Sequence, residues 1–373
     1  MISRRLAIGA ALAAPFVARA QEVHRSQAAT FRVATLATGL QNPWGAAVLP
    51  DGRLLVTERP GRLRVIGPDG TVSAPLAGVP DVVAQGQGGL LDVLLAPDFA
   101  RSREIYLTQA AMLQGGAVTR LVRARLAPDA AALTDVTPLL DATPAQAQGR
   151  NHYGGRMAFG ADGLLYLGVG DRFITPGRAQ RLDDLAGKVL RLTRDGAPAP
   201  QNPFVGQPGA RAEIYTLGHR NPQGMALHPA TGTMFEAEFG PLGGDEINIL
   251  RPGANYGWPL VTHGRNYNGT QISPDTSRPG FEDPARVWVP AISPSGIAFC
   301  TSNAIPGWRG SLFLACLNPP GLVRLAMEGD RITAEERLLW DKIRFRQVVQ
   351  GADGRLLILT DEPRGRILRL DAV

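Results

Sequence analysis

The chain has 373 residues, of which 44% are hydrophobic, and its formal net charge is +6. This length allows one large or two ordinary globular domains. The basic residues form no run and no stripe interleaved with aromatic residues, which argues against nucleic-acid binding. No stretch after the N-terminus is long and apolar enough to cross a membrane. The 44 glycines and 30 prolines favour short strands joined by turns over a helical protein.

The first 20 residues have the pattern of a signal peptide. Arg4 and Arg5 precede an apolar run over residues 7–17, and Ala-Arg-Ala follows at 18–20. A charged start, an apolar stretch and small residues at a cleavage site are typical of secretory signals. The arginine pair fits twin-arginine export as well as an ordinary secretory signal. We expect removal of residues 1–20 and a periplasmic mature protein whose single domain spans 28–373.

One sequence pattern recurs along the chain: a turn ending in Gly, followed by an apolar strand. Strong copies start at Asp51, Asp162 and Asp353, and weaker ones at Thr231 and Arg309. Asp-Gly between strand residues predicts a hairpin, since both residues tolerate a positive φ. Repeated hairpins of this kind predict an all-β, six-bladed β-propeller with four-stranded antiparallel blades. A β-sandwich gives no reason for the related hairpins at both ends.

Polar loops flank these expected strands in chain order. The Gly-rich segment at 85–92 precedes a strand rather than a helix, which disfavours a nucleotide site. His152 lies just before Gly154 and Gly155, which have no side chains and leave space around the imidazole. A His in such a turn can act as a general base. Asp171 follows a strand, where it offers a carboxylate or merely caps a turn.

Further along, Arg220 and Asn221 combine a cation with an amide. Residues 239–258 supply carbonyls and carboxylates of the kind that hard cations bind. The loops of a propeller converge at one mouth of the central channel, which favours a shared site over separate surface roles. The two cysteines, Cys300 and Cys316, lie on expected neighbouring strands, and sequence leaves open whether they form a disulfide.

Taken together, residues 38–370 resemble the quinoprotein glucose/sorbosone dehydrogenase family, in particular its periplasmic aldose sugar dehydrogenases. The matching text is Leu-Gln-Asn-Pro-Trp-Gly at 40–45, Gly-Gln-Gly-Gly-Leu-Leu-Asp at 86–92, Asn-His-Tyr-Gly-Gly-Arg at 151–156, Gly-His-Arg-Asn-Pro-Gln-Gly at 218–224, Gly-Pro at 240–241, Gly-Gly-Asp-Glu-Ile-Asn at 243–248 and Asn-Tyr-Gly-Trp-Pro at 255–259. The resemblance implies a six-bladed propeller that uses pyrroloquinoline quinone (PQQ) and Ca²⁺.

The resemblance also implies roles for single residues. His152 matches the general base that takes the proton of the anomeric C1 hydroxyl of an aldose sugar while hydride passes to the quinone and a lactone forms. Asp171 matches the carboxylate that orients this His. The positions that match cofactor contacts are Gln87, Arg220, Asn221, Arg344 and Arg346. The positions that match calcium ligands are Gly240 and Pro241 in some members, and Glu246 and Tyr256 in others.

The chain departs from the family pattern at three places. Asn318 stands where members carry a Lys that meets the cofactor, and Gln347 stands where an Asp follows the Arg-x-Arg pair. The aromatic residue usually found shortly before Trp288 is also missing. The lost lysine removes one positive contact, worth about 1.5–3 kcal/mol for a charge-assisted hydrogen bond.

Three functions compete at this point. The first is a periplasmic PQQ-dependent aldose dehydrogenase that passes electrons to an external acceptor, a cytochrome or a quinone. The second is a calcium-dependent propeller hydrolase of the lactonase type, but a neutral lactone has no need of Arg344 and Arg346. The third is a non-catalytic propeller that binds a sugar or a protein, against which the retained His152 and Asp171 argue.

Overall fold

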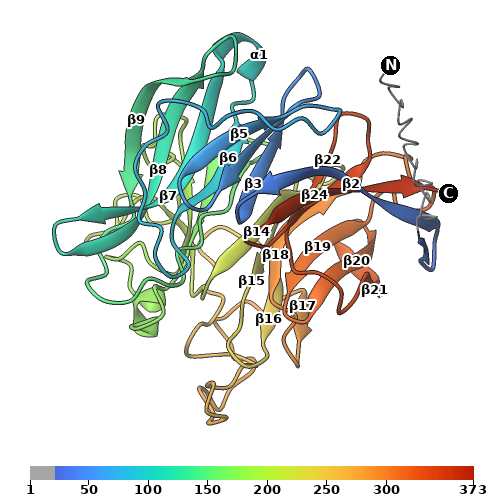
Figure 1. The fold of residues 1–373 in the computed structure, drawn as a ribbon. Coiled ribbons are helices and arrows are strands. Elements are labelled where there is room, and N and C mark those ends of the chain that lie inside the picture. Colours follow the sequence, from blue (N-terminus) through green and yellow to red (C-terminus); the bar gives the residue numbers. More distant parts are fainter. Residues whose placement is uncertain (1–21) are drawn as a thin grey trace, which may run out of the picture.

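The computed structural model describes residues 22–373, so the expected signal peptide lies outside the described residues. Twenty-four strands form six antiparallel sheets, and the only helices in this range are α1 (Phe99–Ser102) and a 3₁₀ turn at Pro176–Gln180. Figure 1 shows the sheets following one another around a centre as the chain runs from blue to red. The expected all-β six-bladed propeller is confirmed. Within residues 22–373, no helix has the length and apolar character to cross a membrane.

We number the sheets as blades 1 to 6 in chain order. Blade 1 consists of β3 (Pro43–Val48), β4 (Leu54–Glu58) and β5 (Arg62–Ile66). Blade 2 consists of β6 (Leu90–Leu95), β7 (Glu104–Leu113), β8 (Gly116–Leu126) and β9 (Leu133–Asp141). Blade 3 consists of β10 (Met157–Phe159), β11 (Leu165–Val169), β12 (Lys188–Leu192) and β13 (Ile214–Leu217).

The second half of the ring is built in the same way. Blade 4 consists of β14 (Pro222–Leu227), β15 (Met234–Glu238), β16 (Asp245–Ile249) and β17 (Arg286–Trp288). Blade 5 consists of β18 (Pro294–Phe299), β19 (Leu312–Leu317), β20 (Pro320–Glu328) and β21 (Arg331–Leu338). Blade 6 consists of β22 (Phe345–Gln350), β23 (Leu356–Thr360), β24 (Gly365–Ala372), β2 (Thr30–Leu40) and β1 (Val23–Arg25).

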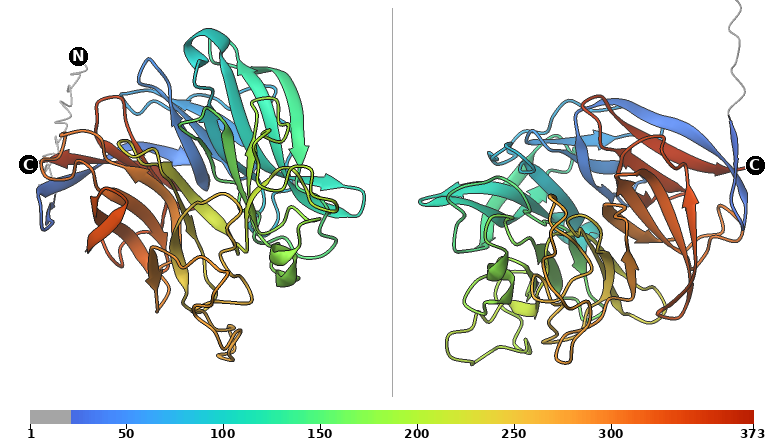
Figure 2. Two further views of the ribbon diagram at one scale, coloured as in Figure 1. Left: turned by 180° about the vertical axis from the view of Figure 1, so that it is seen from behind. Right: turned by 90° about the horizontal axis from the view of Figure 1, so that it is seen from below.

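The first strand of each blade faces the centre of the ring. β3 contacts β6, β6 contacts β10, and the contacts continue through β14, β18 and β22 back to β3. The ring closes in blade 6, where β2 from the N-terminal part pairs with β24 from the C-terminal end, Val33 opposite Leu370. These two strands lie side by side in Figure 1, and Figure 2 shows the closure from behind and from below.

Two blades depart from the four strands expected. Blade 6 has five because the closing strand β2 brings β1 with it. Blade 1 has three because residues 71–77 fill the fourth place irregularly: the amides of Ser73 and Leu76 donate to the carbonyls of Val65 and Leu63. Both Gly67 and Pro68 stand before this segment, and proline cannot donate to a strand ladder.

The recurring turns join the first and second strands of their blades. In the turn between β3 and β4, Asp51 Oδ1 accepts the Arg53 amide at 3.1 Å and Gly52 has φ +85°. The same arrangement recurs at Asp162 between β10 and β11, and at Asp353 between β22 and β23. The sequence repeat therefore marks a structural repeat, since the same turn starts each hairpin.

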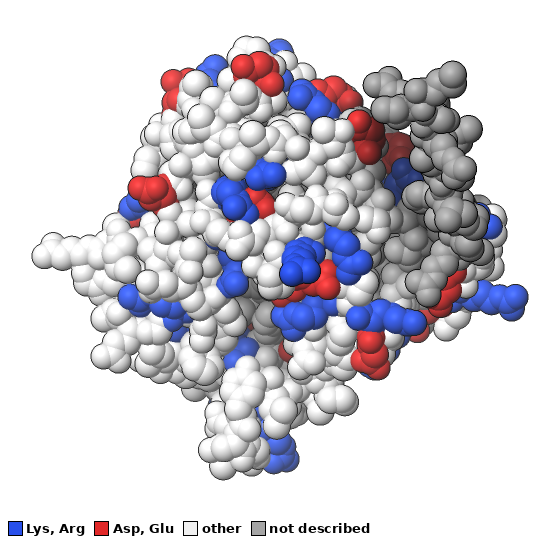
Figure 3. All heavy atoms as spheres, in the orientation of Figure 1, with Lys and Arg blue, Asp and Glu red and all other residues white. Residues whose placement is uncertain are grey.

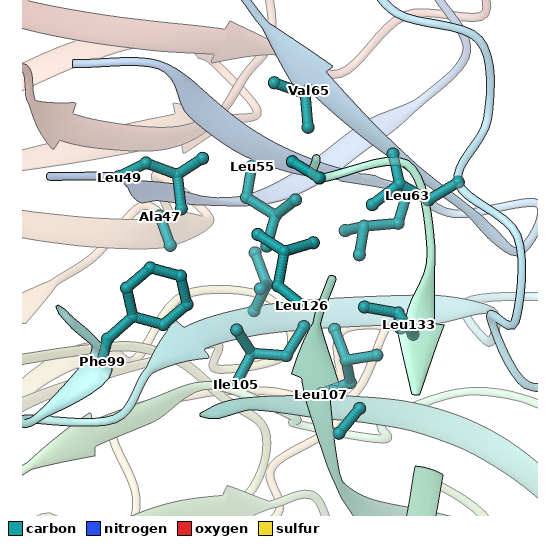
Figure 4. Close-up of a cluster of buried hydrophobic side chains, with 14 of the residues drawn as sticks. Ala47, Leu49, Leu55, Leu63, Val65, Phe99, Ile105, Leu107, Leu126 and Leu133 are labelled. Carbon is teal, nitrogen blue, oxygen red and sulfur yellow. The ribbon is translucent and has the colours of Figure 1, made fainter. Parts of the chain in front are cut away.

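The core lies between neighbouring blades. Figure 4 shows Ala47, Leu55 and Leu63 of blade 1 facing Ile105 and Leu107 of blade 2, with Leu126 and Leu133 beside them. Cys300 and Cys316 are both buried and free, which settles the open disulfide question against a bond. On the face in Figure 3, basic and acidic side chains lie next to one another, so the excess positive charge forms no continuous stripe there.

Candidate active site

His152 and Asp171 form a buried pair. His152 lies in the loop between β9 and β10, and its Nδ1 is 2.7 Å from Asp171 Oδ1. The loop can turn so sharply because Gly154 has φ +64°, and a Cβ there would lie 2.6 Å from the carbonyl oxygen of Gly168. The glycines therefore bring the imidazole down onto the end of β11, after which Asp171 stands.

Asp171 is fixed on both carboxylate oxygens. Its Oδ1 also accepts the Phe173 amide at 2.7 Å, and its Oδ2 accepts Trp258 Nε1 at 2.7 Å. Burial works to raise the pKa of Asp171, but the hydrogen bond and charge of His152 and the Arg220 charge bring it below its ordinary value. Asp171 is therefore an anion that holds the imidazole in one orientation.

His152 is set up as a neutral base. Burial lowers its pKa below the ordinary 6.5, and the hydrogen bond and charge of Asp171 offset part of that effect. The ring packs edge-on against Phe173, with 5.0 Å between centroids. With Nδ1 bound to Asp171, Nε2 is the nitrogen left to take a proton, and no group among residues 22–373 hydrogen-bonds to it. This is the arrangement expected of a general base.

A cavity of about 340 Å³ adjoins this pair. Its lining residues are Asn42, Trp44, Arg59, Gln87, Gln223, Phe239, Tyr267, Ser293, Leu317, Asn318, Arg344, Arg346 and Asp361. Gln87 links the cavity to the pair, since its Oε1 accepts the backbone amide of His152 at 2.9 Å. The structure thus brings three expected cofactor residues, Gln87, Arg344 and Arg346, together with the divergent Asn318.

The cavity is positively charged. Arg59, Arg344 and Arg346 line it with a single carboxylate, Asp361, which leaves two positive charges in excess. Asp361 pairs with both Arg344, at 2.8 Å, and Arg346, at 3.1 Å. Although burial raises the pKa of Asp361, the two arginines bring it down to about 2. Burial and the charge of Arg346 lower the pKa of Arg59. A bound anion would relieve this repulsion.

The other two expected cofactor residues, Arg220 and Asn221, lie at the start of blade 4 and are not among the residues that line this cavity. Arg220 Nη1 donates to the carbonyls of Phe239 and Gly240, at 3.0 and 2.7 Å, and Nη2 reaches the Tyr267 hydroxyl. Asn221 Oδ1 accepts the Gly154 amide at 3.1 Å, which ties it to the His152 loop. Arg220 Nε and Asn221 Nδ2 are buried donors without a partner among residues 22–373. They are available to a bound molecule with acceptor oxygens.

Three of the four expected calcium residues line one small cavity of about 10 Å³: Gly240, Glu246 and Tyr256. This is room for roughly one water molecule or ion. Burial and the charge of Glu238 hold the pKa of Glu246 well above its ordinary value. Pro241 does not line this cavity, and the Tyr256 hydroxyl is occupied by the Ile249 carbonyl and the Arg251 amide.

Comparison with known proteins shows which family the chain belongs to. The profile of the glucose/sorbosone dehydrogenase family matches residues 40–369. The chain belongs to this family. It is 43% identical to Aldose sugar dehydrogenase YliI of Escherichia coli (strain K12), over 92% of this chain and 93% of that one. A crystal structure of a glucose dehydrogenase superposes with a TM-score of 0.89 at 47% identity, covering 91% of this chain and 99% of the other.

A third relative was solved with cofactor. The PQQ-bound form of aldose sugar dehydrogenase from Streptomyces coelicolor has a TM-score of 0.76 and 33% identity, covering 92% of this chain and 98% of that one. As a member of the glucose/sorbosone dehydrogenase family, the protein is an oxidoreductase.

Several residues of the candidate site could not be identified from the sequence. Trp258 was part of a quoted motif, but nothing in sequence indicated that its indole bonds to Asp171, 87 positions away. Arg59 and Asp361 stand singly in turns and carried no signal. Gln347 follows Arg346 where the family has Asp, yet both arginines have a carboxylate partner because Asp361 supplies it.

The pKa of His152 provides a test of this electrostatic arrangement. In Asp171→Asn the two effects that raise this pKa are removed, so we expect it to fall further below its wild-type value, itself below 6.5. Nuclear magnetic resonance titration of the imidazoles measures it, and His152→Gln assigns the signal among the five His of the chain. An unchanged or higher pKa in Asp171→Asn would show that Asp171 does not act on His152. Asp183→Asn, an exposed carboxylate, is the control.

Proposed function

We propose that this protein is a PQQ-dependent aldose dehydrogenase that oxidises the C1 hydroxyl of aldose sugars to lactones and passes the electrons to an external acceptor. The observation that carries the proposal is a neutral buried base, His152, next to a cavity lined by Arg59, Arg344 and Arg346. The names of the relatives support it, since one is an aldose sugar dehydrogenase and another is a PQQ-bound form of such an enzyme.

The residues present fit an anionic quinone cofactor. Arg344 and Arg346 would hold its carboxylates, and Asn318 would offer a neutral contact where the family has Lys. The unpartnered donors of Arg220 and Asn221 would meet further oxygens. When bound, PQQ supplies the acceptor for the two electrons that leave C1 of the sugar with its hydrogen.

The protein itself handles the proton. His152 Nε2 takes the proton of the C1 hydroxyl as the C1 hydrogen leaves as hydride, so that the C1–O bond becomes the carbonyl of the lactone. Asp171 stabilises the resulting imidazolium across the 2.7 Å contact. Trp258 and the Phe173 amide keep the Asp171 carboxylate from turning away. A positioned base of this kind contributes about 10²–10⁴-fold in rate.

We also propose that Ca²⁺ belongs to the working enzyme. Backbone carbonyls and the Glu246 carboxylate are the oxygen ligands that Ca²⁺ prefers. Gly240 and Glu246 border one cavity, which Glu238 also lines, so two carboxylates and a backbone carbonyl lie close together there. A cation near the cofactor would stabilise negative charge that develops on an oxygen.

Reconstitution tests the activity. Purified protein supplied with PQQ and Ca²⁺ should reduce a redox dye when aldoses are added. In His152→Ala we expect kcat to fall by about 10²–10⁴-fold while PQQ absorbance still elutes with the protein on gel filtration. Failure to turn over a broad panel of aldoses, with no retained quinone, would contradict the dehydrogenase. Lactone hydrolysis without cofactor would instead identify a hydrolase, and retained sugar without turnover a binding protein.

Position 318 offers a gain-of-function test of the cofactor site. Asn318→Lys adds a cation to the cavity that Asn318 and Arg344 both line. PQQ should therefore bind about 10–100-fold more tightly. Arg346→Gln should weaken binding by a similar factor, since it removes a guanidinium and releases Asp361. Quenching of tryptophan fluorescence measures both affinities. Lysine at the exposed Asn268 is the control; an equal gain there would mean a general charge effect.

We propose export to the periplasm, on the signal-peptide pattern of residues 1–20. Protein recovered from the periplasm should begin at Gln21 when its N-terminus is sequenced. A chain found in the cytoplasm and still carrying Met1 would refute the proposal.

A further inference from the structure

Blade 4 contains a second polar group that the proposed reaction does not use. It consists of His219, Glu236, Glu238 and Asn248, which we call the blade-four cluster. His219 precedes β14, Glu236 and Glu238 lie on one face of β15, and Asn248 on β16 is directly opposite Glu236. All four side chains are at most 3% exposed. Strand alternation and register therefore place them together in the blade interior.

The side chains converge on one point. His219 Nδ1 lies 3.1 Å from Glu238 Oε1 and 3.9 Å from Glu236 Oε2. Asn248 Nδ2 is 3.1 Å from each of these two carboxylate oxygens. One ligand atom from each of His219, Glu236 and Glu238 lies within 4.8 Å of the others. Such spacing suits ligands arranged about a single ion.

The cluster lacks positive charge. Among residues 22–373, no Lys or Arg forms an ion pair with Glu236 or Glu238; His219 is their only possible cationic neighbour. Burial and the charge of Glu238 hold the pKa of Glu236 well above its ordinary value. Two like charges so close in a dry interior are costly unless a cation joins them.

Two atoms of the cluster have no partner. Glu236 Oε1 and Asn248 Oδ1 are fully buried and accept no hydrogen bond from residues 22–373. Buried acceptors of this kind are rare in folded proteins and call for a ligand, a water or an ion. Because the Asn248 amide already lies among the carboxylates, a half-turn would bring its Oδ1 to the place of Nδ2.

We propose that the blade-four cluster binds one divalent transition-metal ion, Zn²⁺ or Mn²⁺, through His219 Nδ1 and the carboxylates of Glu236 and Glu238, with Asn248 Oδ1 as a fourth ligand. An imidazole ligand favours these ions over Ca²⁺, which prefers oxygen alone. His219 Nε2 lies 2.8 Å from Thr216 Oγ1, and a hydrogen bond donated there leaves the Nδ1 lone pair free.

The ion would stabilise the neighbouring loop. The other oxygen of Glu238, Oε2, accepts the backbone amides of Arg220 and Asn221. A metal on Oε1 would fix this carboxylate and, through it, the backbone of Arg220 and Asn221, the second of which accepts the Gly154 amide of the His152 loop. The ion is distinct from the expected calcium, although Glu238 borders the small cavity that holds Glu246.

Metal content and thermal stability of the cofactor-free protein test the site. Purified wild type, dialysed against chelator and then given one metal at a time, should retain one equivalent of Zn²⁺ or Mn²⁺. Its Tm should rise by roughly 4–6 °C at about 100 times the Kd. In Glu236→Gln both effects should be lost, while the metal-free Tm stays equal or rises, because a buried like charge is removed.

Two controls separate the site from its neighbours. Glu246→Gln changes the calcium cavity and leaves every proposed ligand of the cluster in place. Glu246 Oε2 accepts only a long 3.4 Å hydrogen bond from Asn248 Nδ2, so the Zn²⁺ or Mn²⁺ response should persist in this variant. His228→Asn changes a buried His outside the cluster and should bind as wild type does. If Glu236→Gln does not fold, His219→Asn gives the same comparison.

Other outcomes overturn the proposal. The site is wrong if wild type retains no ion and no metal raises its Tm. It is also wrong if the response survives in Glu236→Gln, or disappears only in Glu246→Gln, since the ion then occupies the calcium cavity. These measurements need no PQQ, so failure here leaves the proposed dehydrogenase untouched, and failure of reconstitution leaves the metal site untouched.

Discussion

Closure of the ring is the constraint on which the site depends. The cavity takes Trp44 and Arg59 from blade 1 and Arg344 and Arg346 from the start of blade 6. These blades are neighbours only because β2 pairs with β24 across most of the chain length. Blades 1 and 6 are adjacent in space and distant in sequence, so one half of the cofactor cavity approaches the other at the seam of the propeller.

Glycines and buried carboxylates have different roles in the site: glycines let backbone segments approach each other closely, and carboxylates hold neighbouring groups in place. The residues around Gly154 let the backbone approach another strand closely, which brings His152 onto Asp171. Asp171, Glu238 and Asp361 then hold an imidazole, a loop backbone and a pair of guanidiniums. Glu238 and Asp361 each act on groups at the start of their own blade, whereas Asp171 of blade 3 also binds Trp258, which follows strand β16 of blade 4. Each functional side chain is therefore held by a buried carboxylate that lies elsewhere in the sequence.

Much of the fold and part of the candidate site could be predicted from the sequence, and the features that could not be predicted have physical reasons. The Asp-Gly turns at Asp51, Asp162 and Asp353 are local signals, because the turn geometry depends on adjacent residues, and they indicate the propeller. The family resemblance implies that His152 and Arg346 serve one site. The Trp258 to Asp171 bond could not be predicted, because it depends on the path of an irregular loop. The uneven strand counts could not be predicted either. Blade 6 gains β1 with the closing strand β2, and residues 71–77 fill the fourth place of blade 1 irregularly.

The pairing of Asp361 with two arginines has a consequence for acid tolerance. With a pKa of about 2, Asp361 remains ionised at neutral and mildly acidic pH, and the guanidiniums do not lose their protons. The charge that anchors an anionic ligand is therefore constant while the medium acidifies, whereas the base takes up a proton. Acid would therefore stop proton removal by His152 before it altered the attraction of the arginine-lined cavity for an anion.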